Sequence, residues 1–403
     1  RATLRSSMPL SRLASIARDA LSTARALTQP ENWARGAGLQ ERADLFHLMS
    51  LRNAHSAWPN VEEQTLEGLR AQASSLESQR ALVSGAALAQ TLGLLEAWRV
   101  EQPPPRPPSD PDKPLAPEQL AAFEAVWAEE VAAAQHRGFG FAIDVAVSSA
   151  GAAAGQGVFI RGSAPPGSVV AIFPGVAYMP VDVLVLPGGL KRFKDNPHLM
   201  ARHDNCFFDA SPAALKRLPP TALACAARPS KIDSLPDSPF TPDHFLRALS
   251  DVRRCPLAVG HRFNHPPAGL APNVLPCAFE FELDTPAELY PLLPVLRLPL
   301  AELKRLPEGE RGGKEGGKDN LLTSGAAISR ADALGNWFRE SLRDISDEQP
   351  DDPAPLRALA FVTTRQVADE ELFLNYRLNP KNSHPPWYTP VDPEEDRRRW
   401  QPR

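Results

Sequence analysis

Apolar side chains in the first third of the chain recur at the spacing of amphipathic helices. They return every three or four positions, which places them on one face of a helix. The segments with this spacing are residues 10–21, 42–54, 78–100 and 117–135. Asn60 begins a further helical segment, because Glu63 follows three positions later, in the order of a capping box. Residues 1–100 contain no clustered His, Cys or Gly motif, so we expect a helical N-terminal region that serves as a scaffold or interaction module.

From residue 139 onward the pattern changes to short apolar runs separated by Pro and Gly. Runs with such boundaries are typical of β-strands, and the Pro-Pro-Gly sequence at 165–167 is a turn between two of them. The expected strands are residues 139–147, 158–161, 169–173, 207–209, 274–283 and 356–363. A helix at 241–249 interrupts them, with Thr241 as its N-cap. The sequence therefore predicts an α+β protein, with a β-rich domain after an α-helical region.

Three stretches lack the composition of a folded core. Residues 101–116 are rich in proline and form an extended linker, for which a ligand of an SH3-type domain is the alternative to a spacer. Residues 301–320 contain five glycines, many charges and no aromatic residue, which predicts a flexible insertion. Residues 380–403 form a C-terminal tail whose aromatic side chains indicate packing onto the body. Residues 117–379 remain as the β-rich domain.

The composition excludes several classes of protein. Hydrophobic residues make up 43% of the 403 positions and charged residues 23%, as in an ordinary globular protein. The net charge of −4 gives no reason to expect a direct nucleic-acid partner. The four cysteines are dispersed without a Cys-x-x-Cys pair, which favours reduced buried thiols in an intracellular protein. No apolar run reaches the roughly 18 residues of a membrane span, so no membrane partner is expected.

Residues 1–30 have the composition of an organelle transit peptide. They contain five arginines and one acidic residue among many Ser, Ala and Leu. A basic amphipathic helix docked on the protein has the same composition and stays open as the alternative. The sequence is therefore compatible with an organelle as well as with the nucleus or cytoplasm.

The stretch most typical of a functional site is residues 255–273, CPLAVGHRFNHPPAGLAPN. A short apolar run leads into Asn264 and His265, and two prolines follow at once. Prolines after a polar pair end both helix and strand and hold the chain on a fixed irregular path. Asn and His together offer hydrogen-bond donors and acceptors on positioned backbone. We therefore expect this segment to build a site rather than a core.

Three further pieces could contribute to the same site, although each has an ordinary interpretation. Gly155 and Gly157 lie between two strands, where glycine lets backbone approach a ligand closely or simply forms a turn. They are not a dinucleotide fingerprint, because the third Gly and the following helix are missing. Phe173 ends a strand before a Pro-Gly turn, as a core residue would. Tyr376 follows an apolar strand, where a core or rim tyrosine is equally expected.

The order and spacing of these pieces resemble one family. Through the runs GQGVFI, VVAIFPGVAY, CPLAVG, APN and EELFLNY, residues 139–376 resemble the SET domain of S-adenosylmethionine-dependent protein lysine methyltransferases. The resemblance implies a β-rich fold with a knot-like crossing, in which the Asn-His segment is threaded beside the final Tyr-bearing strand. It also implies S-adenosylmethionine as cofactor, a lysine-bearing protein as substrate and no metal.

The resemblance assigns the cofactor to two segments. Gly155, Gln156 and Gly157 would line the methionine end of S-adenosylmethionine. Asn264 and His265 would contact its amino-acid and adenine parts, partly through backbone.

The resemblance assigns the chemistry to two aromatic residues. Tyr376 would be the active-site tyrosine beside the transferred methyl group. Phe173 would share the wall of the substrate channel with it. An apolar channel with aromatic walls lowers the pKa of a lysine amine, and aromatic faces also tolerate a cation.

The chain departs from the family pattern at several positions. Pro266 and Pro267 stand where the usual Asn-His-Ser-Cys-x-Pro-Asn segment has Ser and Cys, and Phe173 stands where many relatives have Tyr. Asn375 replaces the common Asp before Tyr376, and no cysteine cluster follows. The alternative function is thus a catalytically weak SET-like binding or scaffold protein, and the basic N-terminus leaves open an organellar protein substrate.

Overall fold

A computed structural model of the chain describes its helices and strands in separate stretches. They are residues 75–103, 117–151, 154–179, 198–202, 204, 206–211, 255–298, 355–380 and 383–400, with single positions within 44–51 and 182–196. Several expectations lie outside the described residues: the targeting segment 1–30, the Asn60 capping box, the linker from residue 104, the helix 241–249, the insertion 301–320 and Cys225.

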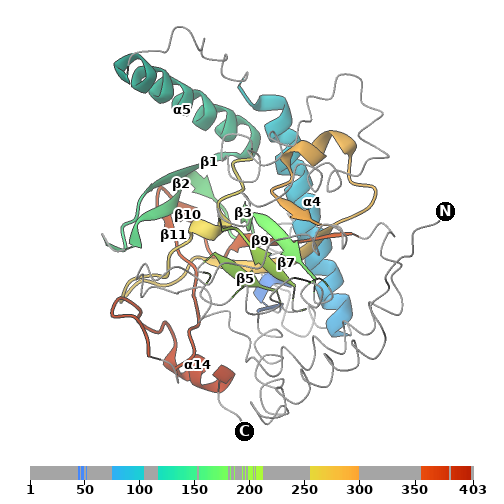
Figure 1. Cartoon of the computed structure of the whole chain (residues 1–403), viewed down its shortest axis with the longest axis vertical. Coiled ribbons are helices and arrows are strands. Elements are labelled where there is room, and N and C mark those ends of the chain that lie inside the picture. Colours follow the sequence, from blue (N-terminus) through green and yellow to red (C-terminus); the bar gives the residue numbers. More distant parts are fainter. Residues whose placement is uncertain are drawn as a thin grey trace, which may run out of the picture.

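Helix α4 (Leu76–Glu101) runs along one side of the sheets (Figure 1). Its N-cap is Ser75, whose hydroxyl accepts the Ser78 N–H at 3.0 Å. The buried face includes Leu95 and Trp98, and the helix packs against strand β7 (Val274–Phe281) and the short helix η5 (Ala287–Leu292). The helix includes Glu101, so the proline-rich linker begins one residue later than predicted.

Helix α5 (Pro117–Phe139) packs on α4 and on strand β1 (Phe141–Val147), at the end of the molecule nearest that strand (Figure 1). It continues past the predicted limit of residue 135 and takes Phe139 out of the predicted strand. The helix ends at Gly140, whose φ of +82° suits glycine and whose N–H still bonds the His136 carbonyl at 3.0 Å.

The strands form three small sheets. The first has the order β1–β2–β10, and β11 also pairs with β2; its strands are β1 (Phe141–Val147), β2 (Gln156–Ala164), β10 (Val367–Ala368) and β11 (Glu371–Leu372). The second has the order β3–β9–β7, with β3 (Val169–Ile172), β9 (Leu356–Thr363) and β7 (Val274–Phe281). Both sheets are antiparallel throughout.

The third sheet has the order β5–β6–β4–β8. Its strands are β4 (Gly175–Tyr178), β5 (Leu199–Ala201), β6 (Phe207–Asp209) and β8 (Val295–Arg297). Here β4 and β8 pair in parallel and the other pairs are antiparallel. Three short helices complete the elements used below: η4 (Gly260–Arg262), η5 (Ala287–Leu292) and α14 (Pro393–Trp400).

The mixed α+β class is confirmed, and none of the sheets in the described part of the chain closes into a barrel. Strands β6 and β9 have the predicted bounds, whereas β2 is longer than predicted. Phe173 lies one residue beyond β3, and β7 ends at Phe281, two residues early. The strand before Tyr376 is only β11, two residues long, so Tyr376 lies in irregular chain rather than at a strand tip.

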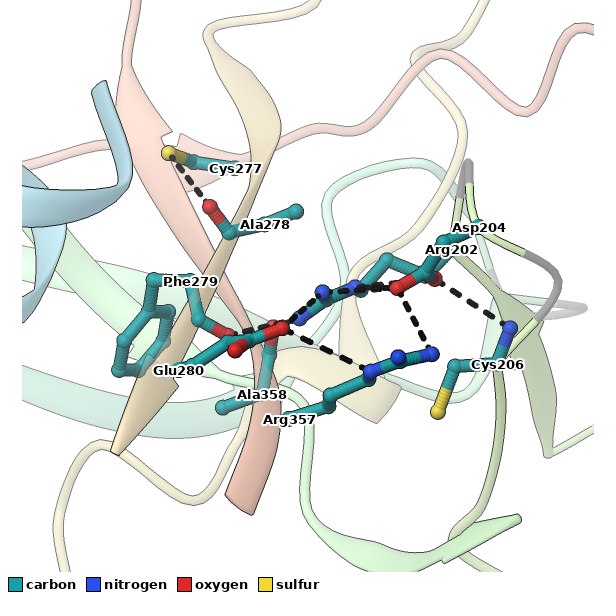
Figure 2. Close-up of polar contacts among 9 residues, drawn as sticks. All are labelled: Arg202, Asp204, Cys206, Cys277, Ala278, Phe279, Glu280, Arg357 and Ala358. Atoms are coloured by element: carbon teal, nitrogen blue, oxygen red, sulfur yellow. Dashed lines mark hydrogen bonds and ion pairs between the residues drawn. The ribbon is translucent and has the colours of Figure 1, made fainter. Parts of the chain in front are cut away.

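Four charged side chains join the second and third sheets: Arg202, Asp204, Glu280 and Arg357, here called the charged cluster (Figure 2). The Arg202 guanidinium contacts Asp204 and Glu280, each at 2.8 Å, and Arg357 contacts Asp204 at 3.2 Å. Arg202 also donates to the Phe279 carbonyl of β7 at 2.7 Å. Two cations and two carboxylates thus balance each other at the place where the sheets meet.

Helix α4 is the single described helix that is long and apolar enough to cross a membrane by length and composition. The same criterion is met by a helix packed against a protein core, which is where Leu95 and Trp98 lie. The buried thiols of Cys206, Cys255 and Cys277 are free, as the dispersed cysteines predict.

Candidate functional site

Phe373 and Leu374 lie between the two ends of the 264–274 segment. The Leu374 N–H donates to the Asn264 carbonyl at 2.9 Å, and the Asn273 N–H donates to the Phe373 carbonyl at 3.1 Å. Two parallel bridges, Asn264 with Phe373 and Val274 with Leu374, mark the same contacts. Residues that are about 110 positions apart in the chain are therefore held together by backbone hydrogen bonds.

Asn273 fastens this crossing from within. Its side chain is completely buried. The amide oxygen accepts the Phe373 N–H at 2.7 Å, and the amide nitrogen donates to the Glu371 carbonyl at 2.8 Å. Both ends of the amide are therefore used on backbone, because a buried asparagine must satisfy its donors and its acceptor. The role of Asn273 is to hold the 371–373 backbone.

Tyr376 follows the crossing and turns its hydroxyl back toward it. The hydroxyl donates to the Phe263 carbonyl at 2.6 Å, and the Tyr376 N–H points at His265 Nδ1 at 3.4 Å. Burial raises the pKa of the Tyr376 phenol above its ordinary value, and the negative charge of Glu371 adds to the shift. The phenol is therefore protonated at neutral pH, and its oxygen keeps lone pairs for a further donor.

His265 is buried, with 4% of its surface exposed, and both ring nitrogens have partners. Since a carbonyl only accepts, Nε2 must donate its proton to the Thr389 carbonyl at 2.7 Å. Nδ1 then carries the lone pair that faces the Tyr376 N–H. Burial lowers the pKa of His265, so the ring is neutral at neutral pH. Its side chain therefore belongs to the internal framework.

The C-terminal tail completes an aromatic cluster of His265, Tyr376, Trp387 and Tyr388. Tyr388 stacks on His265 with ring centroids 4.4 Å apart, and Trp387 stands edge-on to Tyr376 at 6.4 Å. These separations lie in the range of favourable aromatic pairs. The tail packs onto the body next to Tyr376, as its aromatic content predicts.

Asn264 and Arg262 connect the same place to the start of β2. The Asn264 amide donates to the Gln156 carbonyl at 2.9 Å, and the Arg262 guanidinium donates to the Gln156 side-chain oxygen. The Nε atom of Arg262 is buried without a hydrogen-bond partner. Gln156 is thus held at both its backbone and its side chain, while one guanidinium donor is unused.

Glu371 is the residue of this region that the sequence reasoning did not single out. Its carboxylate is buried and accepts the Ser148 hydroxyl at 2.7 Å, the Ser149 N–H at 2.6 Å and the Ser149 hydroxyl at 2.5 Å. A Cβ on Gly157 would come within 2.0 Å of the same carboxylate. Gly157 is therefore glycine because Glu371 occupies the space of a side chain. The spacing between 157 and 371 offers no sequence signal for this contact.

Gly155 differs from Gly157 in both conformation and surroundings. Its φ is +68°, in the left-handed region that favours glycine, and a Cβ there would meet nothing within 4 Å. The backbone at Gly155 is consequently open on the side where a side chain would stand, which suits close approach of a ligand.

Phe173 lies in the core rather than in the aromatic cluster. Its side chain is completely buried, and its ring meets those of Phe208 and His261 edge-on at 6.3 and 6.5 Å. Burial lowers the pKa of His261 to about 3, and the Arg262 charge adds to the shift. The His261 Nδ1 atom is buried and has no hydrogen-bond partner. The core interpretation of Phe173 therefore describes its place better than a channel wall does.

Of the residues singled out from the sequence, the structure brings together Gln156, Gly157, Asn264, His265 and Tyr376, around the crossing of 371–376. Among the described residues, no three His, Cys, Asp or Glu side chains are grouped in a way that could hold a metal ion. Comparison of the chain with protein-family models, with curated proteins and with solved structures gave no match.

Proposed function

We propose that the chain is a protein-lysine N-methyltransferase of the SET type that uses S-adenosylmethionine. The observation that carries the proposal is the crossing of two distant segments, 264–274 and 371–376, with Tyr376 at its exit. It agrees with the arrangement that the family resemblance implies for the Asn-His segment and the final tyrosine. The Tyr376 hydroxyl, which keeps a free lone pair beside this crossing, is the group that supports the proposal chemically.

The residues around Gln156 fit an amino-acid carboxylate and its neighbours. A guanidinium pairs well with a carboxylate, and the Arg262 Nε donor is buried and unused. The open backbone at Gly155 leaves room for the same group. Because the side chains of Asn264 and His265 are engaged inside the protein, these two residues would hold the cofactor through their backbone.

The bound cofactor would supply an electrophilic methyl group on a sulfonium centre. The lysine amine must reach it neutral and aligned, and a free lysine with a pKa near 10.4 is mostly protonated at pH 7. Aromatic surroundings such as Tyr376 and Trp387 would exclude water from the amine. Loss of water disfavours the charged ammonium, so the lysine would release its proton to solvent as it enters. In the proposed reaction the amine nitrogen would gain the methyl group, and the cofactor would leave as a neutral thioether.

Tyr376 would orient the amine. Its hydroxyl proton is donated to the Phe263 carbonyl, so the oxygen can accept an N–H of the lysine and turn the nitrogen lone pair toward the methyl group. Such alignment can lower the barrier by several kcal/mol without covalent catalysis.

The decisive variant is Tyr376→Phe, which keeps the ring and removes only the hydroxyl. We expect transfer of labelled methyl groups to lysate proteins to fall by about 100-fold or more, with cofactor binding nearly unchanged in calorimetry. Tyr290→Phe is a matched control, because Tyr290 is buried in η5 and its hydroxyl has no hydrogen-bond partner. Absence of cofactor binding by the unchanged protein at saturating concentration would overturn the proposal.

One observation favours the second candidate, a SET-like binding or scaffold protein without turnover. The His265 ring and the Asn264 amide nitrogen are bound to internal partners, and Phe173 is a core residue. Calorimetry separates the two functions, because a scaffold has no need to bind S-adenosylmethionine.

A further inference from the structure

Arg377, the residue directly after Tyr376, has an unusual backbone conformation. Its φ is +49°, and among the described residues only Asp369 shares a positive φ without being glycine. A side chain with a Cβ is strained in this region. The conformation persists only where surrounding contacts hold it, and those contacts come from both ends of the chain.

The Arg377 guanidinium makes a two-pronged ion pair with Asp44. Its two terminal nitrogens lie 2.8 and 2.9 Å from the two Asp44 oxygens, although the residues are 333 positions apart. The Nε atom lies 3.4 Å from the Glu395 carboxylate in α14. Burial opposes the charge on Arg377, yet Asp44, Glu395 and Asp396 raise its pKa above the ordinary value. Paired charges of this planar geometry are the strong kind.

The segments on both sides of Arg377 are anchored to the rest of the protein. Asp44 is followed by Leu45 and Leu48, which lie in the main hydrophobic core. On the other side, the Leu378 N–H donates to the Tyr388 hydroxyl at 3.0 Å, and Tyr388 stacks on His265. The chain after Tyr376 is therefore held between an N-terminal segment and the C-terminal tail.

We propose that Asp44, Arg377 and Glu395 form a positioning clamp that holds the Tyr376 hydroxyl toward the Phe263 carbonyl. Arg377 is a positioning residue, because it acts through its neighbour. The N-terminal segment that carries Asp44 then belongs to the active unit, and any change that withdraws it loosens Tyr376. The catalytic consequence rests on the proposed function, whereas the effect on the backbone does not.

The first test uses hydrogen exchange and needs no catalysis. In the full chain, Asp44→Asn should speed amide exchange at Leu374, Tyr376 and Leu378 by about tenfold, because their hydrogen bonds open more often. Glu101→Gln is the control, since it breaks the exposed Glu101–Arg137 pair on another face. If exchange at these amides stays unchanged in Asp44→Asn, the clamp is overturned.

A second variant guards against misfolding of the first. Glu395→Gln weakens the other side of the same guanidinium and leaves Asp44 in place, so its effect on the same amides should be smaller but of the same sign. Unchanged exchange in a folded Glu395→Gln protein, together with loss of folding in Asp44→Asn, would also overturn the clamp, because Asp44 would then serve stability alone.

The third test separates positioning from general stability. With the proposed reaction as readout, Asp44→Asn should lower kcat by about tenfold while leaving KM for S-adenosylmethionine unchanged. Asp44→Glu, which keeps the charge, should restore most of the rate. An equal fall in kcat for Glu101→Gln would contradict the clamp. If the unsubstituted protein transfers no methyl group, the proposed function is wrong. The hydrogen-exchange experiment alone then tests the clamp.

Discussion

The charged cluster and the Tyr376 and His265 side chains use polar groups in different ways. In the charged cluster, Arg202 is paired with Asp204 and Glu280, and charge balances charge between two sheets (Figure 2). Around Tyr376 the phenol is protonated and the His265 ring is neutral, each fastened to backbone carbonyls. Buried ion pairs demand complete pairing, whereas a neutral hydroxyl keeps an acceptor for a further partner.

This difference indicates a division of work within one fold. The charged cluster holds two sheets together. Its Arg202 guanidinium also donates hydrogen bonds to backbone carbonyls of β7 and β9. The region around Tyr376 holds two irregular segments together, and the Arg262 Nε donor beside Gln156 has no hydrogen-bond partner. A place with fixed backbone and spare hydrogen-bonding capacity is suited to a ligand, and a fully paired place is suited to stability.

The charged cluster should show the largest effect, as a loss of stability. Arg202→Met removes the central cation and leaves the Asp204 and Glu280 carboxylates without it. We expect the free energy of unfolding to fall by about 3–5 kcal/mol, measured by urea denaturation. Arg161→Met breaks an exposed ion pair with Asp144 and should cost less than about 1 kcal/mol. Equal losses in the two variants would contradict the division of work.

A smaller effect separates the two glycines next to the site. Gly157→Ala forces the Glu371 carboxylate away from Ser148 and Ser149, and we expect a loss of about 2 kcal/mol of stability. Gly155→Ala meets open space and carries only the strain of its φ of +68°, about 1 kcal/mol. Thermal or urea unfolding of the two variants measures the difference. A larger loss of stability in Gly155→Ala than in Gly157→Ala would contradict the close contact between Gly157 and Glu371.

The smallest effect uses pH, since three buried histidines lie outside the charged cluster, which contains no histidine. Burial lowers the pKa values of His198, His261 and His265 in the folded protein. Between the unfolded value of about 6.5 and the lower folded values, the unfolded chain binds more protons. Stability is therefore complete above pH 6.5 and falls as the pH drops, until about pH 3 for His261.

The slope is at most about 1.4 kcal/mol per pH unit for each histidine. Urea unfolding at several pH values between 7.5 and 5 measures it, and NMR titration of the ring protons assigns each histidine. A stability that stays level between pH 6.5 and 5 would show that these rings charge freely in the folded protein.

The sequence by itself determined the local elements and the segments to watch. Short apolar runs predicted β9 and β6 at their observed bounds, because the composition of a strand is a local property. The build of the Asn-His segment with its prolines marked it as a candidate site. Composition and helical spacing likewise indicated α4 and α5, with errors confined to their ends.

Only the tertiary structure decided which side chains meet. Asn273 binds backbone 98 positions away at Glu371, and Arg377 binds Asp44 across 333 positions. Gly157 is explained by Glu371, and Phe173 by its core neighbours, neither of which is near in sequence. A buried polar group takes its partner from segments that are distant in the sequence and meet only in the folded chain. A local sequence pattern therefore cannot predict that partner.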